Sequence, residues 1–163
     1  MPDGLSADRR SYTSRWRVRT YELDVNGHVN NAVYLNYAEQ IATEHAEAAG
    51  FGRDWIVAQG GAWVVRRHEI VYHQPARYGD ELELTTRVDE LRGARGRRLT
   101  SIVRVHDGAG KPHGGEDADA GVRRTRDAGV PIADVQTEWV WVRAADGRPA
   151  RVPPELVKYF GAG

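Results

Sequence analysis

The chain has 163 residues, with 23 Lys plus Arg against 23 Asp plus Glu and no cysteine. This length favours one domain with its own core, and the lack of cysteine excludes disulfides, thiolate metal sites and a Cys nucleophile. The charge balance gives no indication of nucleic acid or membrane as a partner, and no apolar run resembles a signal peptide or a membrane span. The sequence therefore predicts a single domain, residues 1–163, in a cytoplasmic protein.

The first predicted elements are a strand and a long helix. Residues 1–10 are polar and are expected to be frayed, whereas partial alternation over residues 12–21 is typical of a half-buried strand. Apolar residues at steps of three and four then predict a helix from an N-cap at Asn30 to Ala49, with Gly50 as its C′ residue. The apolar positions of this helix are Val33, Tyr34, Tyr37, Ala38, Ile41, Ala42, His45 and Ala49.

Four more strands follow the helix, after a short segment at residues 51–59. They are expected over residues 62–73, 81–91, 97–106 and 135–143. Long strands joined by short turns favour an antiparallel sheet of about five strands, and one helix packed on such a sheet gives an α+β architecture.

Two segments interrupt or follow this pattern. Residues 107–130 contain six glycines with scattered charges and almost no large apolar residue, so they are expected to form a loop insertion. The tail around Val152 predicts a short helix with Pro154 near its first position.

The turn before the helix carries the strongest chemical signal. Asp24, Asn26, His28 and Asn31 lie within eight residues. Asp24 can act as a nucleophile or as a general base for water, or it can cap the turn that follows it. His28 can orient water, bond a substrate carbonyl or hold Asp24. A helix N-terminus presents N–H groups that polarise a carbonyl, so a carboxylate beside it predicts acyl-transfer hydrolysis.

Other residues leave more than one interpretation open. Glu39 on the helix is a second carboxylate or part of a solvated face, and Tyr34 and Tyr37 are core or pocket-wall residues. The histidines show no metal-ligand spacing, and there is no Gly-x-Ser-x-Gly elbow, phosphate loop or dinucleotide fingerprint. The sequence therefore predicts neither a metal nor a cofactor.

The helix-entry segment resembles a known family. The run Asp-Val-Asn-Gly-His-Val-Asn-Asn at residues 24–31 is similar to the motif of hotdog-fold thioesterases of the 4-hydroxybenzoyl-CoA thioesterase-like group, and especially to that of acyl-ACP thioesterases. Weaker similarities are found at Tyr37 and Glu39, at residues 78–80, and over residues 138–153. The resemblance extends from about residue 12 to residue 156, apart from the insertion.

This resemblance implies a fold, an activity and roles for residues. It implies a hotdog fold, in which a sheet wraps around one long central helix, and hydrolysis of an acyl-CoA or acyl-ACP thioester by a homodimer or homotetramer. Asp24 would be the catalytic carboxylate, the N–H of Asn31 would polarise the carbonyl, and Asn26 and His28 would be catalytic or supporting. The acyl-ACP branch also uses an acid on the strand after the helix, where residues 71–76 contain none.

Substrate contacts and competing functions complete the expectations. An acyl tunnel would be lined by Trp63, Tyr34, Tyr37 and Ile41. The arginines that are candidates for binding a CoA nucleotide are Arg66, Arg67, Arg77, Arg97 and Arg98. Two other functions suit the same fold: a dehydratase acting on 3-hydroxyacyl thioesters, and a non-catalytic acyl-binding module.

Overall fold

The computed structural model describes residues 8–108 and 129–161, so most of the expected insertion lies outside the described residues. Within them the chain forms, in order, β1 Ser11–Arg17, the 3₁₀ turn η1 Thr20–Glu22, α1 Val33–Ala48, α2 Arg53–Ala58, β2 Gly61–Tyr72, β3 Glu81–Arg92, β4 Arg95–His106, β5 Val130–Arg143 and α3 Pro154–Phe160.

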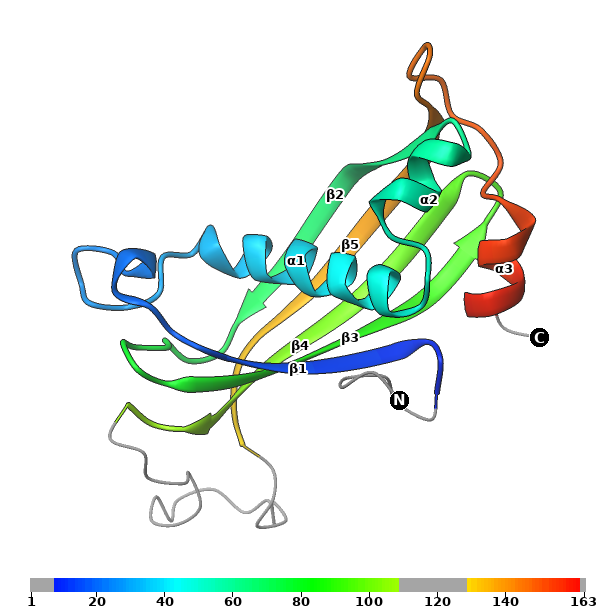
Figure 1. Cartoon of the computed structure of the whole chain (residues 1–163). Coiled ribbons are helices and arrows are strands. Elements are labelled where there is room, and N and C mark those ends of the chain that lie inside the picture. The colour runs from blue at the N-terminus through cyan, green and yellow to red at the C-terminus, as the bar shows by residue number, and fades with distance from the viewer. Residues whose placement is uncertain (1–7, 109–128, 162–163) are drawn as a thin grey trace.

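As predicted, the five strands form one antiparallel sheet, and their order in it is β1-β3-β4-β5-β2 (Figure 1). The architecture is α+β, because α1 crosses one face of this antiparallel sheet. Strands β1 and β2 are the two edge strands of the sheet. Strand β3 shows why the alternation was informative: Leu82, Leu84, Thr86 and Val88 are buried, while the residues between them are more exposed. Period-two burial of this kind follows from side chains that point alternately to the two faces.

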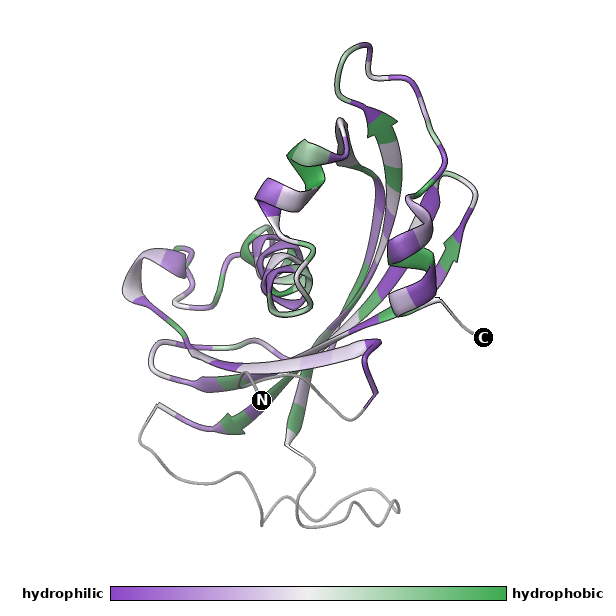
Figure 2. Cartoon of the chain, turned by 45° about the vertical axis from the view of Figure 1, so that its right-hand side comes forward, coloured by the Kyte–Doolittle hydropathy of each residue, from purple (hydrophilic) through white to green (hydrophobic). Residues whose placement is uncertain are grey.

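Helix α1 packs its apolar stripe against the sheet. Its buried residues are Tyr34, Tyr37, Ala38, Ile41, Ala42 and His45, which confirms the predicted three- and four-residue periodicity. Figure 2 shows α1 almost end-on, on the concave side of the curved sheet. A main core forms where this stripe meets Leu82, Leu84, Ile102 and Ile132.

A second cluster of buried residues lies at the end of the sheet that α3 covers. Val88 and Trp141 pack there with three residues of the C-terminal segment, Val152, Leu156 and Phe160. Helix α3 begins at Pro154 as expected, because a proline at the first helical position removes only an N–H that has no partner in the helix.

Several predicted boundaries were wrong. The N-cap of α1 is Ala32, because Asn30 instead closes a turn by accepting the Ala32 N–H on its side chain and the Val33 N–H on its carbonyl. Strand β1 ends at Arg17, where the next N–H, that of Val18, donates to Asp80.

The two segments expected to lack structure are partly ordered. Arg10, placed in a frayed N-terminus, accepts the Val88 N–H on its carbonyl and donates from its guanidinium to the carbonyls of Val88 and Asp89. Strand β5 begins at Val130, which pairs with Arg104, so the expected insertion ends earlier than residue 130.

Candidate functional site

The loop before α1 is a tight turn closed by Asp24. The backbone N–H groups of Asn26 and His28 donate to Oδ1 of Asp24 at 2.8 and 3.3 Å, and the Asp24 N–H donates to the His28 carbonyl at 2.8 Å. Gly27 has φ +73°, a value that side chains rarely adopt. Asp24 therefore does cap the turn, but only through Oδ1: in the described part of the chain, Oδ2 makes no hydrogen bond.

The start of α1 lies beside this turn. The Asn31 carbonyl accepts a hydrogen bond of 2.9 Å from the Tyr72 hydroxyl. The Asn31 N–H has no acceptor among residues 8–108 and 129–161, whereas the next two N–H groups both donate to Asn30. A backbone N–H without an acceptor in the described residues therefore lies near the half-buried carboxylate of Asp24.

These groups share a pocket of about 310 Å³. It brings together five of the predicted site residues: Asp24, Asn26, His28, Asn31 and Tyr34. Five other lining residues were not predicted as site residues. They are Val29, Tyr72 at the end of β2, and the three residues that follow it, His73, Gln74 and Pro75.

The end of β2 reaches the pocket through backbone contacts. The Val29 N–H donates to the Ala76 carbonyl at 2.9 Å, and His28 and Arg77 form an isolated antiparallel bridge. The buried Tyr34 hydroxyl accepts the Ala76 N–H at 3.2 Å, and burial raises the pKa of Tyr34. Thus the helix-entry loop and the segment after β2 hold each other in place, although more than 40 residues separate them.

A second imidazole lines the same pocket. His73 Nε2 lies 2.7 Å from Oδ2 of Asp134, and both side chains are exposed. The sequence showed no acid in residues 71–76, but the register between β2 and β5 places Asp134 beside this segment. No sequence signal identifies the pair, because it depends on that register.

Tyr37 lies in the core and not in the pocket wall. Its hydroxyl donates to Oε2 of the buried Glu22 at 2.6 Å, and Glu22 also accepts from Arg19 at 2.9 Å. Burial, with the Glu22 contact second, raises the pKa of Tyr37. Its expected substrate contact stays a prediction, and Tyr37 is not among the residues that line the Asp24 pocket.

Glu39 and Trp63 lie elsewhere. The exposed Glu39 is 3.3 Å from Nε2 of His68, whose Nδ1 lies 3.0 Å from the Thr137 hydroxyl. Trp63 packs edge-on against Trp141, with ring centroids 5.2 Å apart, and lines a separate cavity of about 410 Å³ at the other end of α1. Neither residue lines the pocket that contains Asp24.

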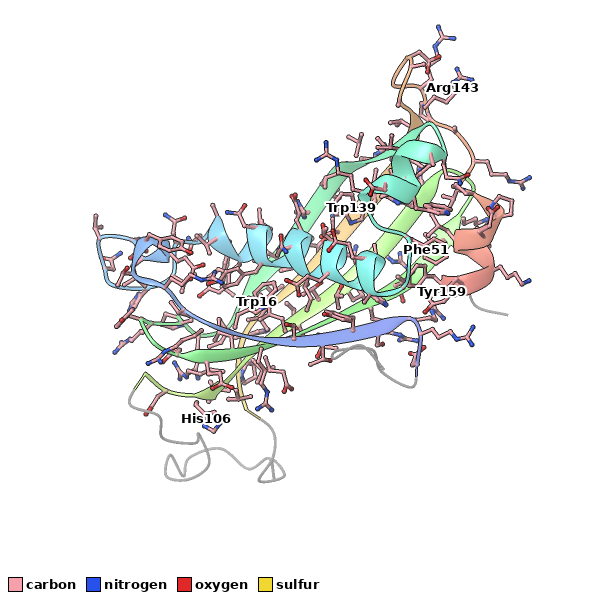
Figure 3. The ribbon with its side chains drawn as sticks, in the orientation of Figure 1. Trp16, Phe51, His106, Trp139, Arg143 and Tyr159 are labelled. Carbon is pink, nitrogen blue, oxygen red and sulfur yellow. The ribbon has the colours of Figure 1, made fainter. Side chains whose placement is uncertain are left out.

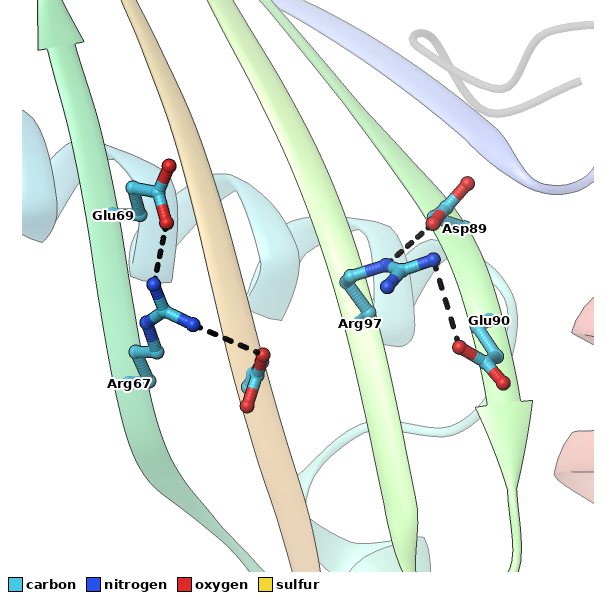
Figure 4. Close-up of polar contacts among 6 residues, drawn as sticks. Arg67, Glu69, Asp89, Glu90 and Arg97 are labelled. Carbon is cyan, nitrogen blue, oxygen red and sulfur yellow. Dashed lines mark hydrogen bonds and ion pairs between the residues drawn. The ribbon is translucent and has the colours of Figure 1, made fainter.

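The candidate CoA-binding arginines occupy both faces of the sheet. Arg67 pairs with Glu69 and Glu138, and Arg97 pairs with Asp89 and Glu90, on the face turned away from α1 (Figure 4). Arg66 and Arg77 are exposed, whereas Arg98 faces α1. No group of three or more metal-ligating side chains occurs in the described residues, and no helix there is long and apolar enough to cross a membrane.

Comparison with known proteins places the chain in a family. Residues 18–160 match the profile described as the Thioesterase-like superfamily. The chain is 36% identical over 81 residues to the acyl-CoA thioester hydrolase YbgC of Escherichia coli, a match covering 48% of this chain and 60% of YbgC. It is 35% identical over 104 residues to the Escherichia coli long-chain acyl-CoA thioesterase FadM, covering 64% of this chain and 74% of FadM.

A solved structure agrees with this assignment. The crystal structure of YbaW, a probable thioesterase from Escherichia coli, superposes with a TM-score of 0.69 at 26% identity, over 91% of this chain and 96% of YbaW. The sequence profile covers nearly all of the described fold, including the helix-entry turn and the whole sheet from β2 to β5. The chain belongs to the thioesterase-like superfamily of hotdog-fold proteins.

Proposed function

We propose that the chain hydrolyses an acyl-CoA or acyl-ACP thioester to a free acid and a thiol. The observation that carries this proposal is the free Oδ2 of Asp24 in one pocket with the free N–H of Asn31. Family membership and the names of the relatives, which are acyl-CoA hydrolases, support the same reaction class.

Two routes use these groups. In the first, Oδ2 of Asp24 takes a proton from water, the resulting hydroxide attacks the thioester carbonyl, and the Asn31 N–H stabilises the oxyanion. Collapse expels the thiolate, which receives the proton from Asp24. In the second route Oδ2 itself attacks, which releases the thiolate and forms an anhydride that water then hydrolyses.

The remaining pocket residues have supporting roles in this proposal. Oδ1 of Asp24 is occupied by two backbone N–H groups, so these bonds orient Oδ2 toward the reaction. His28 and Asn26 lie where they can bond the incoming water or the thioester. The Tyr72 hydroxyl donates to the carbonyl of Asn31. This bond fixes the backbone at Asn31 and thereby positions the N–H of the same residue, which contacts the oxyanion in this proposal.

We also infer that α1 is the central helix of a hotdog arrangement and that β2 is the edge through which two subunits meet. An edge strand leaves backbone N–H and carbonyl groups unpaired, and a second copy satisfies them. Strand β2 exposes three large side chains, Val64, Val71 and Tyr72. Tyr72 belongs to the Asp24 pocket, so this interface would border the active site of a dimer or of a tetramer built from dimers.

A thiol-release assay with a panel of acyl-CoA and acyl-ACP substrates tests the activity. Release of thiol that requires Asp24 supports hydrolysis. Loss of water from a 3-hydroxyacyl thioester without thiol release would instead identify a dehydratase, and binding without turnover would identify an acyl-binding module.

A further inference from the structure

A cavity with mainly apolar walls lies at the other end of α1, beside the sheet. Its volume is about 410 Å³, within the range of small-molecule sites. The second half of α1, the segment through α2, the inner face of the sheet and α3 enclose it. Apolar lining residues include Ala42, Phe51, Ile56, Trp63, Leu91 and Leu156.

One wall of this cavity carries a cation, Arg98. It pairs across the sheet with the buried Thr137, so its side chain is on the face that packs against α1. Its Nη1 donates to Nδ1 of His45 at 3.0 Å, and its guanidinium lies 5.9 Å from the ring centroid of Phe160. Burial lowers the pKa of Arg98 to about 10, which leaves it charged at neutral pH.

His45 does not neutralise this charge. Because Arg98 donates to Nδ1, the ring proton is on Nε2, which donates to the Arg9 carbonyl at 3.0 Å. Burial, together with the nearby Arg98 charge, lowers the pKa of His45 to about 4. The imidazole is therefore a neutral acceptor, and no ion pair involves Arg98 among residues 8–108 and 129–161.

Two other arginines of β4, Arg97 and Arg104, form ion pairs with carboxylates. Arg97 pairs with Asp89 at 2.6 Å on the outer face, and Arg104 pairs with the buried Asp80 at 3.2 Å (Figure 4). Arg98 is the half-buried arginine of this strand that lacks a carboxylate in the described structure. An unpaired charge taken out of water is costly, and an anionic ligand would remove that cost.

A buried donor without an acceptor also lines this cavity. The indole N–H of Trp139 is buried and has no hydrogen-bond partner in the described residues. Trp139 comes from β5, and Phe51 approaches from the loop after α1 (Figure 3). The cavity therefore combines apolar walls with a cation that has no carboxylate partner and a buried indole N–H that has no acceptor in the described residues.

We propose that this cavity binds an apolar carboxylate, with its head group on Arg98 and its hydrocarbon tail against the apolar walls. The carboxylate is that of a free carboxylic acid or the distal carboxylate of a dicarboxylic acyl group. The site shares no lining residue with the Asp24 pocket. Tyr34 and Ala42 are eight positions apart on α1, or about 12 Å at the helical rise of 1.5 Å per residue, so the site stands apart from the proposed reaction.

Calorimetric titration with octanoate and with octan-1-ol tests the anionic part of this site. The two probes have the same tail, and only octanoate has a charge. We expect octanoate to bind the unmodified protein at least tenfold more tightly than octan-1-ol. Equal affinities, or no binding of octanoate, would overturn the proposal without the need for any variant.

Two matched variants locate the contact. Arg98→Met should abolish the preference for octanoate, while Arg67→Met, which removes an arginine of the outer face that does not line this cavity, should retain it. Thermal melting checks that both variants fold. An octanoate affinity in folded Arg98→Met that equals that of the unmodified protein would contradict the role of Arg98.

Kinetics then separate the two sources of the carboxylate. If the distal carboxylate of an acyl group binds here, Arg98→Met raises KM for octanedioyl-CoA at least tenfold and leaves KM for octanoyl-CoA unchanged. If a free acid binds here, both KM values stay the same while octanoate binding is lost. Both results support the site. The KM comparison rests on the proposed thioesterase function, whereas the octanoate titration needs no turnover, so failure of the site and failure of the proposed function are distinguishable.

Discussion

The hydroxyl of Tyr72, the last residue of β2, donates a 2.9 Å hydrogen bond to the carbonyl of Asn31, where the chain enters α1. The ring of Tyr72 also packs edge-on against Tyr34, with ring centroids 5.6 Å apart. One side chain of the sheet edge thus fixes the peptide whose neighbouring N–H faces the thioester in the proposed reaction.

Replacing Tyr72 by Phe should therefore lower kcat. One hydrogen bond contributes about 0.5–1.5 kcal/mol, so the loss should be roughly two- to twelvefold, with little change in KM. Steady-state thiol release measures it. Tyr21→Phe removes a hydroxyl from a side chain that is 78% exposed and serves as the control. A Tyr72→Phe enzyme as active as the unmodified protein would separate this contact from catalysis.

Asp24→Asn should reduce kcat by about 100-fold or more, because the lost carboxylate acts in the chemical step. Asparagine keeps an Oδ1 that accepts the Asn26 N–H, so the turn and the melting temperature should be retained. His28→Ala should lose less activity, since His28 supports the reaction without supplying base or nucleophile. Activity of Asp24→Asn within a few-fold of normal would contradict the assignment of Asp24 as the catalytic carboxylate.

Tyr37→Phe should destabilise the protein without a specific effect on substrate binding. The change removes the 2.6 Å hydrogen bond to the buried Glu22, whose Oε2 then keeps only the backbone N–H of Arg19 as a donor. A loss of about 1–3 kcal/mol in the free energy of unfolding is expected, measured by urea titration. An unchanged unfolding midpoint, with KM raised instead, would return Tyr37 to the substrate site.

The stability should depend on pH through His45. Its pKa is about 4 in the folded protein and 6.5 when exposed, so the unfolded chain binds more protons between these values. Stability from this group is therefore fully present above pH 6.5 and is lost as the pH falls toward 4, by about 3 kcal/mol. Comparing urea unfolding of His45→Gln and the unmodified protein over this range isolates the effect, and identical pH profiles would refute it.

The proposed β2 interface predicts a homo-oligomer. Sedimentation at micromolar concentration should show at least a dimer of the 18.2 kDa chain. Val71→Asp, which places a charge on the exposed edge strand, should shift the protein toward monomer, whereas Val157→Asp on α3 should not. A single species of monomer mass for the unmodified protein would rule the interface out.

Local patterns in the sequence were sufficient to predict the long helix and the strands, and to nominate Asp24 as a candidate site residue. The burial of Tyr34, Ala38, Ile41 and Ala42 follows from helical periodicity, and β3 follows from alternation, because both periods are properties of the backbone alone. Asp24 was identifiable because its chemistry is contained within eight residues before a helix.

Tertiary structure decided which distant residues join that site. Tyr72 and His73 reach the pocket, and Asp134 reaches His73, only through the pairing of β2 with β5 and through the bond between Val29 and Ala76. The same packing turned Tyr37 toward Glu22 and left Arg98 facing an apolar cavity. Periodicity assigns a residue to a face of its own element, but the neighbour across that face depends on strand order and register, which no local segment encodes.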